Sequence, residues 1–436
     1  MALSRLVWLG LAACGAVSAP ANNDAKTVDT TPMIDAPAPG PVNVVTQSRF
    51  SGGPPPGSPL GGIAVFAIRP DGTLADMQTT DASAATATLQ AYDGDSVTAL
   101  YPHMGDAGAD LTTFMGVKHG DTLTFGLRFG LSSALVGSMN IAWPAIANTN
   151  YVVYTDCGGY GFGTATSGSI SEYTYCHRDP MDVMIVARDA TTSIVTQAGL
   201  IPAVAFQNGG TATLQNWHAA TSTKSLQITG LPSEVTNVSM SQFEVISGNA
   251  AFSFGAGGAP SNGQFTSSAF QWPGQATLEW TRIFLMRQGN WAQMGIFDNT
   301  APTIQPYSIT APALPPWMTT NYVFSAAAQM MAWFPVGTGP QKGTILRVNW
   351  SHNGVPYSWS FVVPPGVTAL TFPKLPDAVA MNAPHLEDTG GVNYVRTFDI
   401  PELAGYDDVR KLPEMTLTGL DIAVEAGQLK RVIQNF

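Results

Sequence analysis

Residues 343–366, GTILRVNWSHNGVPYSWSFVVPPG, carry the clearest secondary-structure signal of the C-terminal region. Two runs in it alternate apolar and polar residues, which is the pattern of a half-buried β-strand. Between the runs lies Asn353-Gly354, a pair that favours the type I′ turn because both residues tolerate positive φ angles. The stretch therefore predicts a β-hairpin.

Similar runs recur along the chain. Strands are expected at residues 63–68, 87–89, 97–100, 114–118, 121–126, 151–155, 182–188 and 203–206. One short helix is expected over residues 401–414, with Pro401 at its start. The 44 Gly and 32 Pro residues suit many strands joined by many turns. The predicted fold class is all-β, with tandem antiparallel β-sandwich domains after a signal peptide and a disordered linker.

The composition limits the partners. The 436 residues carry a net charge of −11, and only 11% of them are charged. No basic cluster is present, so nucleic acid is excluded as a partner, since phosphate binding needs concentrated positive charge. No apolar run of 18 residues follows residue 14, so the sequence predicts no transmembrane helix.

The N-terminal residues form a secretory signal. Arg5 and the amino terminus supply positive charge, an apolar run covers residues 6–11, and the small Ala12 and Ala13 precede Cys14. The segment LAAC resembles the lipobox of bacterial lipoproteins. The resemblance implies cleavage before Cys14, lipidation of Cys14 and an anchor in the cell envelope. The Gly15 that follows points to the outer membrane, facing the periplasm or the outside. An ordinary signal peptide with an incidental cysteine is the alternative.

Five segments are expected on this basis. Residues 1–13 are the signal peptide, and residues 14–58, rich in Pro, Gly, Ala, Ser and Asp, form a flexible linker after the lipidated cysteine. Residues 59–136, 137–230 and 231–436 follow as three β domains. Residues 61–102 contain a strand and turn, a "TDA" segment and "GD" before "VTA", and they resemble carboxypeptidase regulatory-like modules. That resemblance implies a small transthyretin-like β-sandwich that acts as a spacer or binding appendage and is not catalytic.

The other two cysteines are Cys157 and Cys176. Apolar-rich runs flank a Gly-, Ser- and Thr-rich segment between them, which indicates two strands and a loop. An even pair in an oxidising compartment predicts a disulfide. A metal site formed by both cysteines and His177 is the alternative, but two adjacent ligands and one distant ligand do not match a zinc spacing.

Catalytic and metal-binding motifs were not found, and no cofactor is expected. Ser351 and His352 could form a triad with an Asp, but polar residues are expected at a hairpin tip. Two acidic pairs could contact Ca²⁺, yet solvated turn acids are the favoured interpretation because their spacing matches no calcium loop. The pairs are Asp93 with Asp95, and Asp106 with Asp110.

Seven of the ten tryptophans follow residue 231 and could form a sugar-binding platform. Trp333, Trp350 and Trp359 lie in apolar or alternating runs, so core packing explains them. Trp317, after two prolines, is the best candidate for an exposed ligand-binding ring. The leading hypothesis is a non-enzymatic envelope lipoprotein that displays an adhesion or binding module for an envelope or extracellular protein. A glycan-binding protein is the alternative, and a hydrolase with an unrecognised site is a third.

Overall fold

A computed structural model describes most of the chain after residue 37. Residues 39–436 form one compact unit. The described ranges are 38–48, 59–103, 108–127, 134–155, 157–173, 177, 179–192, 195–219, 223–246, 250–270, 276–287, 293–300, 306–425 and 427–435. The signal peptide and Cys14 lie outside these residues. None of the described helices is long and apolar enough to cross a bilayer.

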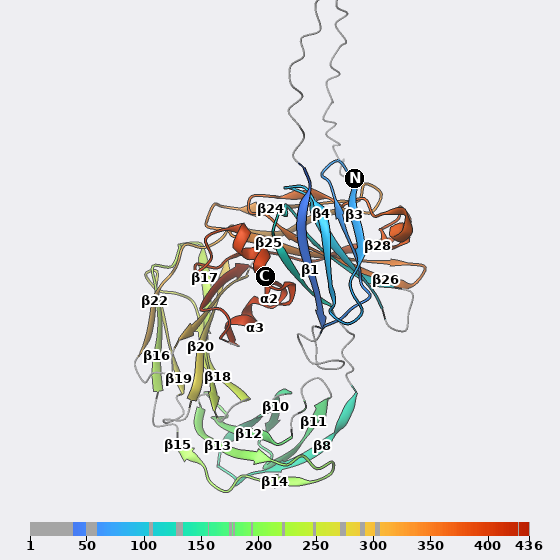
Figure 1. The fold of residues 1–436 in the computed structure, drawn as a ribbon. Coiled ribbons are helices and arrows are strands. Elements are labelled where there is room, and N and C mark those ends of the chain that lie inside the picture. The colour runs from blue at the N-terminus through green and yellow to red at the C-terminus, as the bar shows by residue number, and fades with distance from the viewer. Residues whose placement is uncertain are drawn as a thin grey trace, which may run out of the picture. The chain divides into compact units, whose positions relative to one another are not determined.

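A twelve-stranded sheet is the centre of the fold (Figure 1). Its order is β18 (Ala250–Gly258), β17 (Val235–Ile246), β20 (Ala276–Arg287), β21 (Gln293–Thr300), β29 (Arg431–Asn435), β28 (Thr389–Asp399), β25 (Gly343–His352), β26 (Val355–Val363), β6 (Ala109–Phe114), β5 (Ser96–Pro102), β2 (Ala64–Ile68) and β3 (Leu74–Thr79). Neighbouring strands are antiparallel, except that β26 and β6 are parallel. Strands of the expected first and third domains therefore share one sheet.

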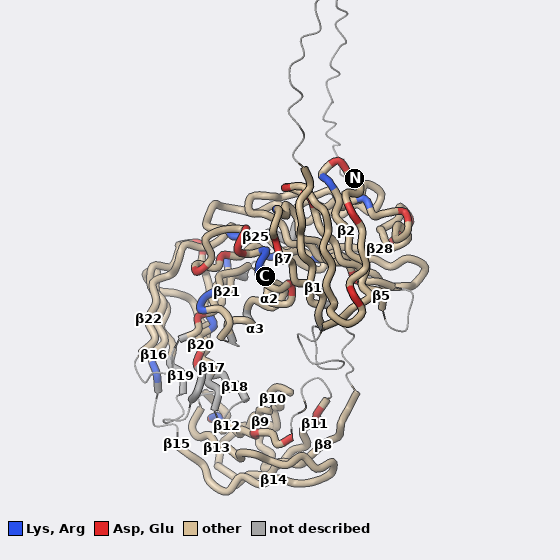
Figure 2. The backbone as a smooth tube through the Cα atoms, viewed as in Figure 1, with Lys and Arg blue, Asp and Glu red and all other residues tan. Residues whose placement is uncertain are grey.

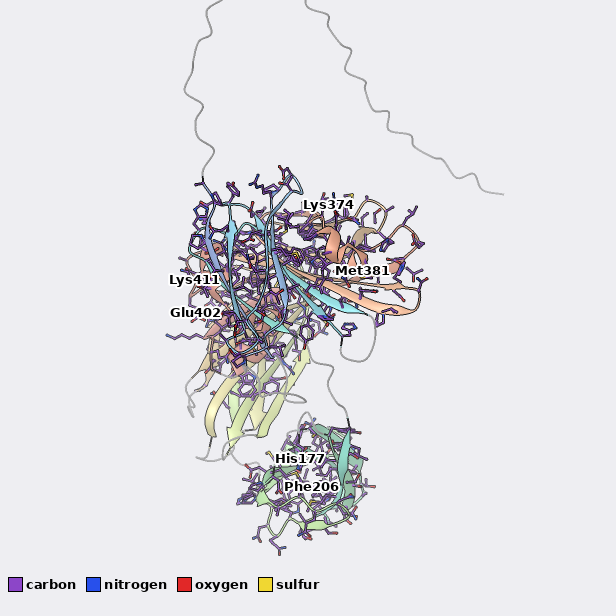
Figure 3. The ribbon with its side chains drawn as sticks, turned by 45° about the vertical axis from the view of Figure 1, so that its right-hand side comes forward. His177, Phe206, Lys374, Met381, Glu402 and Lys411 are labelled. Atoms are coloured by element: carbon purple, nitrogen blue, oxygen red, sulfur yellow. The ribbon has the colours of Figure 1, made fainter. Side chains whose placement is uncertain are left out.

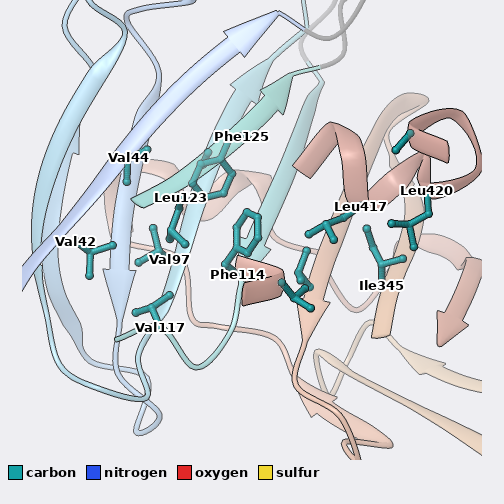
Figure 4. Packing of buried hydrophobic residues seen from close by; sticks show 14 of the residues in the cluster. Val42, Val44, Val97, Phe114, Val117, Leu123, Phe125, Ile345, Leu417 and Leu420 are labelled. Atoms are coloured by element: carbon teal, nitrogen blue, oxygen red, sulfur yellow. The ribbon is translucent and has the colours of Figure 1, made fainter. Parts of the chain in front are cut away.

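A second layer covers one face of the sheet beside β2 and β5. It consists of β4 (Thr86–Ala91), β1 (Gly40–Ser48) and β7 (Thr122–Leu127), with the short helices α1 (Tyr406–Lys411), α2 (Glu414–Thr418) and α3 (Leu420–Glu425). Buried residues of both layers and of the helices form one core (Figure 4). In it the Phe114 and Phe125 rings meet edge to face, with centroids 5.2 Å apart.

Strand β1 corrects the expected linker. Residues 14–58 were expected to be extended and mobile, but residues 40–48 pair with β4 and β7. Val42 and Val44 are completely buried in the core, and the intervening Asn43 is exposed. The alternation of these side chains is a strand signal. The Pro-, Gly- and Ala-rich composition around the segment concealed it.

The hairpin of residues 343–366 is confirmed. Strands β25 and β26 pair along their whole length, and Asn353 and Gly354 connect them with φ angles of 51° and 80°. Strands at residues 63–68, 87–89, 97–100, 121–126, 151–155 and 182–188 are also found to within a residue or two. Residues 115–118 form no strand. Of the strand expected at residues 203–206, only residues 203–204 are strand, as the end of the longer β13.

The helix expected over residues 401–414 begins only at Tyr406 and ends at Lys411. Two further helices follow it. Pro413 explains the break, because proline cannot donate the backbone hydrogen bond that would continue α1, and it stands immediately before α2. The helical region is therefore longer than expected and divided into three.

Four smaller sheets complete the fold. Residues 135–219 form a sandwich of a five-stranded sheet and a three-stranded sheet around their own core. The five-stranded sheet is β10 (Gly158–Gly163), β9 (Thr149–Thr155), β12 (Met181–Asp189), β13 (Val195–Val204) and β15 (His218–Ala219). The three-stranded sheet is β11 (Ser167–Tyr173), β8 (Leu135–Ala142) and β14 (Thr211–Thr213).

The other two layers pack on the central sheet. The sheet of β19 (Phe265–Phe270), β16 (Thr223–Thr229) and β22 (Tyr307–Thr310) shares a core with β17, β20 and β21. The sheet of β23 (Trp317–Ser325), β24 (Met330–Val336) and β27 (Ala369–Thr371) shares a core with β25, β26 and β28. A short 3-10 helix, Asp377–Asn382, follows β27. The all-β architecture with several sandwich layers is therefore confirmed.

Candidate functional site

The expected cysteine pair is described only in part. Cys176 lies outside the described residues, so the disulfide stays a prediction. Cys157 Sγ lies 3.0 Å from Glu172 Oε2, and Thr155 Oγ1 donates to Glu172 Oε1 at 3.1 Å. The Glu172 side chain is completely buried, and His177 Nδ1 lies 3.8 Å from its Oε2.

His177 also packs edge to face on Phe206, with ring centroids 4.9 Å apart (Figure 3). The carboxylate of Glu172 is thus surrounded by a sulfur, a hydroxyl and an imidazole, all from the sandwich of residues 135–219. Across the described residues, no group of three His, Cys, Asp or Glu side chains is arranged to hold a metal ion.

Trp317 does not present the expected exposed ring. Its side chain is only 5% exposed and packs in the core beneath β17, β20 and β21. Trp317 is the first residue of strand β23, and its ring faces the protein interior because it packs in this core. Trp333, Trp350 and Trp359 are buried as expected, at 1%, 4% and 0% exposure. The most exposed large aromatic among the described residues is Phe334, at 51%.

The hairpin tip does hold a histidine–aspartate pair. His352 Nδ1 and Asp388 Oδ1 are 2.7 Å apart, and the Asp388 side chain is 1% exposed. The other oxygen of Asp388 accepts the His385 backbone N–H at 2.7 Å, and the two imidazole rings stand 4.8 Å apart. Ser351 is adjacent to His352 in β25, and successive strand residues point to opposite faces, so no triad with Ser351 is assembled.

The first acidic pair behaves as turn acids. Asp95 is buried and accepts the Tyr92 N–H at 2.8 Å, and desolvation raises the pKa of its carboxyl. Asp93 is exposed and accepts the His119 N–H at 2.9 Å. In the second pair, Asp106 lies outside the described residues, and Asp110 binds a guanidinium.

Asp110 is the centre of the candidate site, a cluster that also contains His103, Arg347 and Ser358. Arg347 Nη2 donates to Asp110 Oδ1 at 3.1 Å and to Ser358 Oγ at 2.6 Å. Ser358 Oγ donates in turn to Asp110 Oδ1. His103 Nε2 lies 3.5 Å from the same oxygen. Three side chains from three other segments therefore meet at the Asp110 carboxylate.

Strand register explains this meeting. Asp110 is directly opposite Tyr101 on β5 and Ser358 on β26, and Ser358 is opposite Asn349 on β25. Opposite residues share a face of the sheet. Further along the same face, Val97, Phe114 and Val362 lie in the core under β1, β4 and β7. The face is thus apolar where the second layer covers it and polar where that core ends.

The Asp110 cluster remains partly open to solvent. The side chains of Asp110, Arg347 and His103 are 19%, 15% and 22% exposed. Asn349 is exposed and accepts the Arg347 Nε–H at 3.3 Å. Burial raises the pKa of Tyr101 to about 12, and the Asp110 charge adds to the shift, so this phenol stays protonated at neutral pH.

The cluster is suited to hydrogen-bond recognition. The hydroxyl of Ser358 is bonded to a carboxylate and a guanidinium, and the imidazole of His103 contacts the carboxylate instead of the hydroxyl. The cluster presents charged and amide groups in fixed positions at a partly open sheet surface. Figure 2 marks the positions of Lys, Arg, Asp and Glu along the backbone and shows that they are sparse.

Comparisons with known proteins give no family. No protein-family model matches the sequence, and no curated protein matches it. The distantly similar solved structures include three named proteins. The Bacillus anthracis TIE protein is 10% identical, with 63% of this chain and 50% of that chain covered and a TM-score of 0.16. The chain therefore spans half the length of that protein.

The fimbrial anchor protein Mfa2 from Porphyromonas gingivalis is 10% identical, with 56% and 77% covered and a TM-score of 0.12. The streptococcal ancillary pilin is 8% identical, with 74% and 99% covered and a TM-score of 0.14. These TM-scores are too low to place the chain in any of these families.

Proposed function

We propose that the chain is a non-catalytic binding or display protein of the cell envelope, with the Asp110 cluster as its contact surface. The observation that carries the proposal is the partly open polar region of the central sheet around β25, β26 and β6. There a carboxylate, a guanidinium and an amide are held by strand register and by one another. Groups fixed in this way lose little conformational freedom when a partner binds.

The partner is a hydrogen-bonding surface on an envelope or extracellular protein. A glycan platform of tryptophans receives less support, because Trp317 and the other C-terminal tryptophans that are described are buried. The test is capture of envelope proteins from a detergent extract by the immobilised chain, followed by titration of each captured protein against the wild type. The Arg347→Met variant should weaken binding at least about tenfold, because a lost charged hydrogen bond costs roughly 1.5–3 kcal/mol.

A matched control is Lys374→Met, a cation outside the cluster (Figure 3). It should leave the affinity unchanged. Equal affinity of the wild type and the Arg347 variant for every captured partner would contradict the assignment of the surface. Hydrolytic turnover by the purified chain that a single substitution abolishes would contradict the non-catalytic proposal itself.

Anchoring is the second part of the proposal. The LAAC segment supports lipidation of Cys14, and the acyl chains would bind the outer membrane, since each buried CH₂ adds about 0.8 kcal/mol. The Cys14→Ser variant should move from the membrane fraction to the soluble fraction. Mass spectrometry of the envelope protein tests the same point, because lipidation requires a mass that starts at Cys14 and includes lipid.

The same mass measurement tests a Cys157–Cys176 disulfide, which an oxidising envelope compartment would favour. Reduction should add two hydrogens to the intact chain. An unchanged mass after reduction would mean that the two thiols are not paired.

A further inference from the structure

A lysine and a glutamate meet in the interior of the sandwich formed by β16, β19 and β22 with β17, β20 and β21. Lys224, on β16, and Glu279, on β20, are in direct contact through Nζ and Oε1. Each side chain is only 1% exposed. The two strands belong to different layers of the sandwich (Figure 1), so the contact crosses its core.

Other polar groups share this interior. Gln242 and Thr281 are completely buried and directly opposite each other on β17 and β20. Thr281 and Glu279 are two residues apart on β20, so both face the same way. Ser267 is 6% exposed and lies opposite Leu226, a core residue.

These neighbours leave several polar atoms without hydrogen bonds. Neither polar atom of the Gln242 amide has a partner, and neither the Ser267 hydroxyl nor the Thr281 hydroxyl has one. Glu279 Oε2 is also without a partner. A buried polar atom without a partner costs free energy, and a buried charge costs more. With an ion pair at this position, several buried polar atoms around it therefore lack hydrogen bonds.

We propose that Lys224 and Glu279 are joined by an amide bond between Nζ and Cδ. In this reaction a proton first passes from Nζ to the carboxylate, which leaves a neutral amine and a neutral acid. The Nζ lone pair attacks Cδ and forms the C–N bond. The C–O bond to the hydroxyl then breaks, a second Nζ proton goes to the departing oxygen, and one water molecule leaves. No oxidant, reductant or further reactant is needed.

The interior favours this condensation in three ways. The two reacting groups are held in contact by the fold, which replaces a bimolecular encounter with an intramolecular one. Bulk water is excluded, so the reverse hydrolysis lacks its reactant. The product is neutral, so the cost of holding two charges away from water disappears.

Gln242 has a positioning role in the proposal. Its side-chain amide faces the same interior as Glu279 from the neighbouring strand, and its Nε2–H has no acceptor. An unused donor in this interior can stabilise the negative oxygen that develops when Nζ attacks Cδ.

The crosslink would close a loop between positions 55 residues apart and would connect the two layers covalently. A pulling force could then not separate β16 from β20. This property would suit a protein displayed on a cell surface, but the proposal depends only on the buried pair.

Trypsin digestion of the denatured full chain tests the proposal. Between Arg188 and Arg282 the only trypsin site is Lys224, and trypsin needs a free lysine amine. A free Lys224 gives separate peptides of residues 189–224 and 225–282. A crosslinked Lys224 gives the uncut peptide of residues 189–282, lighter than its sequence mass by one water molecule.

Two variants serve as controls. Lys224→Arg keeps the charge pair and should restore cleavage after residue 224. The double variant Lys224→Met, Glu279→Leu replaces the pair by apolar side chains, a change that buried ion pairs often tolerate. Its folded state, checked by circular dichroism, shows that the sandwich forms without the bond.

The expected wild-type result is the uncut, lighter peptide in most molecules. The Gln242→Leu variant should lower the crosslinked fraction at least several-fold while circular dichroism stays unchanged. Complete cleavage of the wild type after Lys224, with the sequence mass in both peptides, would overturn the proposal. An uncut peptide at its full sequence mass would overturn it as well, since no water would have been lost.

Discussion

Strand β1 provides the sharpest test of how this chain folds. Val44 is completely buried and pairs with Ala87 on β4 and Leu123 on β7. The Val44→Ala substitution removes two methyl groups from a packed core. At about 0.8 kcal/mol for each, plus the cost of the cavity left behind, the loss is about 2 kcal/mol.

Native-state hydrogen exchange of the full chain measures this loss locally. Protection of the amides of β1, β4 and β7 should fall roughly 30-fold, since about 1.4 kcal/mol corresponds to a factor of ten. Asn43→Ala is the matched control, because Asn43 lies on the same strand but is exposed. Its effect should stay within about 0.5 kcal/mol.

Two outcomes would refute the reasoning. The first is exchange of residues 40–48 at the rate of an unstructured chain in the wild type, which would restore the flexible linker. The second is equal effects of Val44→Ala and Asn43→Ala, which would mean that the buried face of β1 contributes nothing.

Three other changes have definite expected outcomes. Gly354→Ala should lower the unfolding free energy by about 1 kcal/mol, because the φ angle of 80° at this position strains any residue with a Cβ. The control is Gly391→Ala, which should be nearly neutral because no atom beyond the adjacent residues lies within 4 Å of the added Cβ and the φ angle is not positive. Urea unfolding compares the two variants. Trp359→Ala should cost about 4 kcal/mol in the same assay, because the ring is completely buried and donates to Thr113 Oγ1 at 2.7 Å. Burial raises the pKa of Tyr101 from 10.0 to about 12, so the stability it contributes is fully present below about pH 10 and is lost as the pH rises through about 12. The stability of Tyr101→Phe, measured by urea unfolding between these pH values, should therefore fall less steeply with pH than that of the wild type.

Local sequence signals predicted the elements well. Asn353-Gly354 between two alternating runs specified a turn and its register, because the type I′ geometry needs residues that accept positive φ. The strands at residues 63–68 and 151–155 were predicted from their apolar-rich runs. Alternation also marks β1, but the surrounding prolines and glycines dominated the average composition of the segment.

The sequence predicted the candidate site much less well. Asp110, Arg347 and Ser358 are brought together by the parallel pairing of β6 with β26, and Ser358 is 248 residues from Asp110. No local pattern encodes a pairing over that distance. Lys224 and Glu279 were missed for a related reason, since a single charged residue in a strand is usually read as solvent-facing.

Trp317 shows the opposite error. Two preceding prolines end regular structure, and a large ring after them was expected at the surface. The prolines lead instead into β23, which turns the ring inward against the core below β17 and β20. The prolines therefore determine where strand β23 begins, whereas the packing of the layers determines which way its first side chain points.

Strand β29 shows why the central sheet has to be treated as one structure. It pairs with β21 on one side and with β28 on the other, so five residues connect the strands before residue 300 with those after residue 343. Asn435 bonds through Nδ2 to the Pro316 carbonyl oxygen, and its Oδ1 accepts the Thr397 N–H at 2.6 Å. Arg431 binds Asp298 through two nitrogens, at 3.0 Å and 2.9 Å. The parallel pair of β26 and β6 makes a similar connection to the strands before residue 115. The Asp110 cluster lies beside the junction of β6 with β26. Its geometry therefore depends on strands from the N-terminal part of the chain and on strands after residue 343, and neither set alone would hold it.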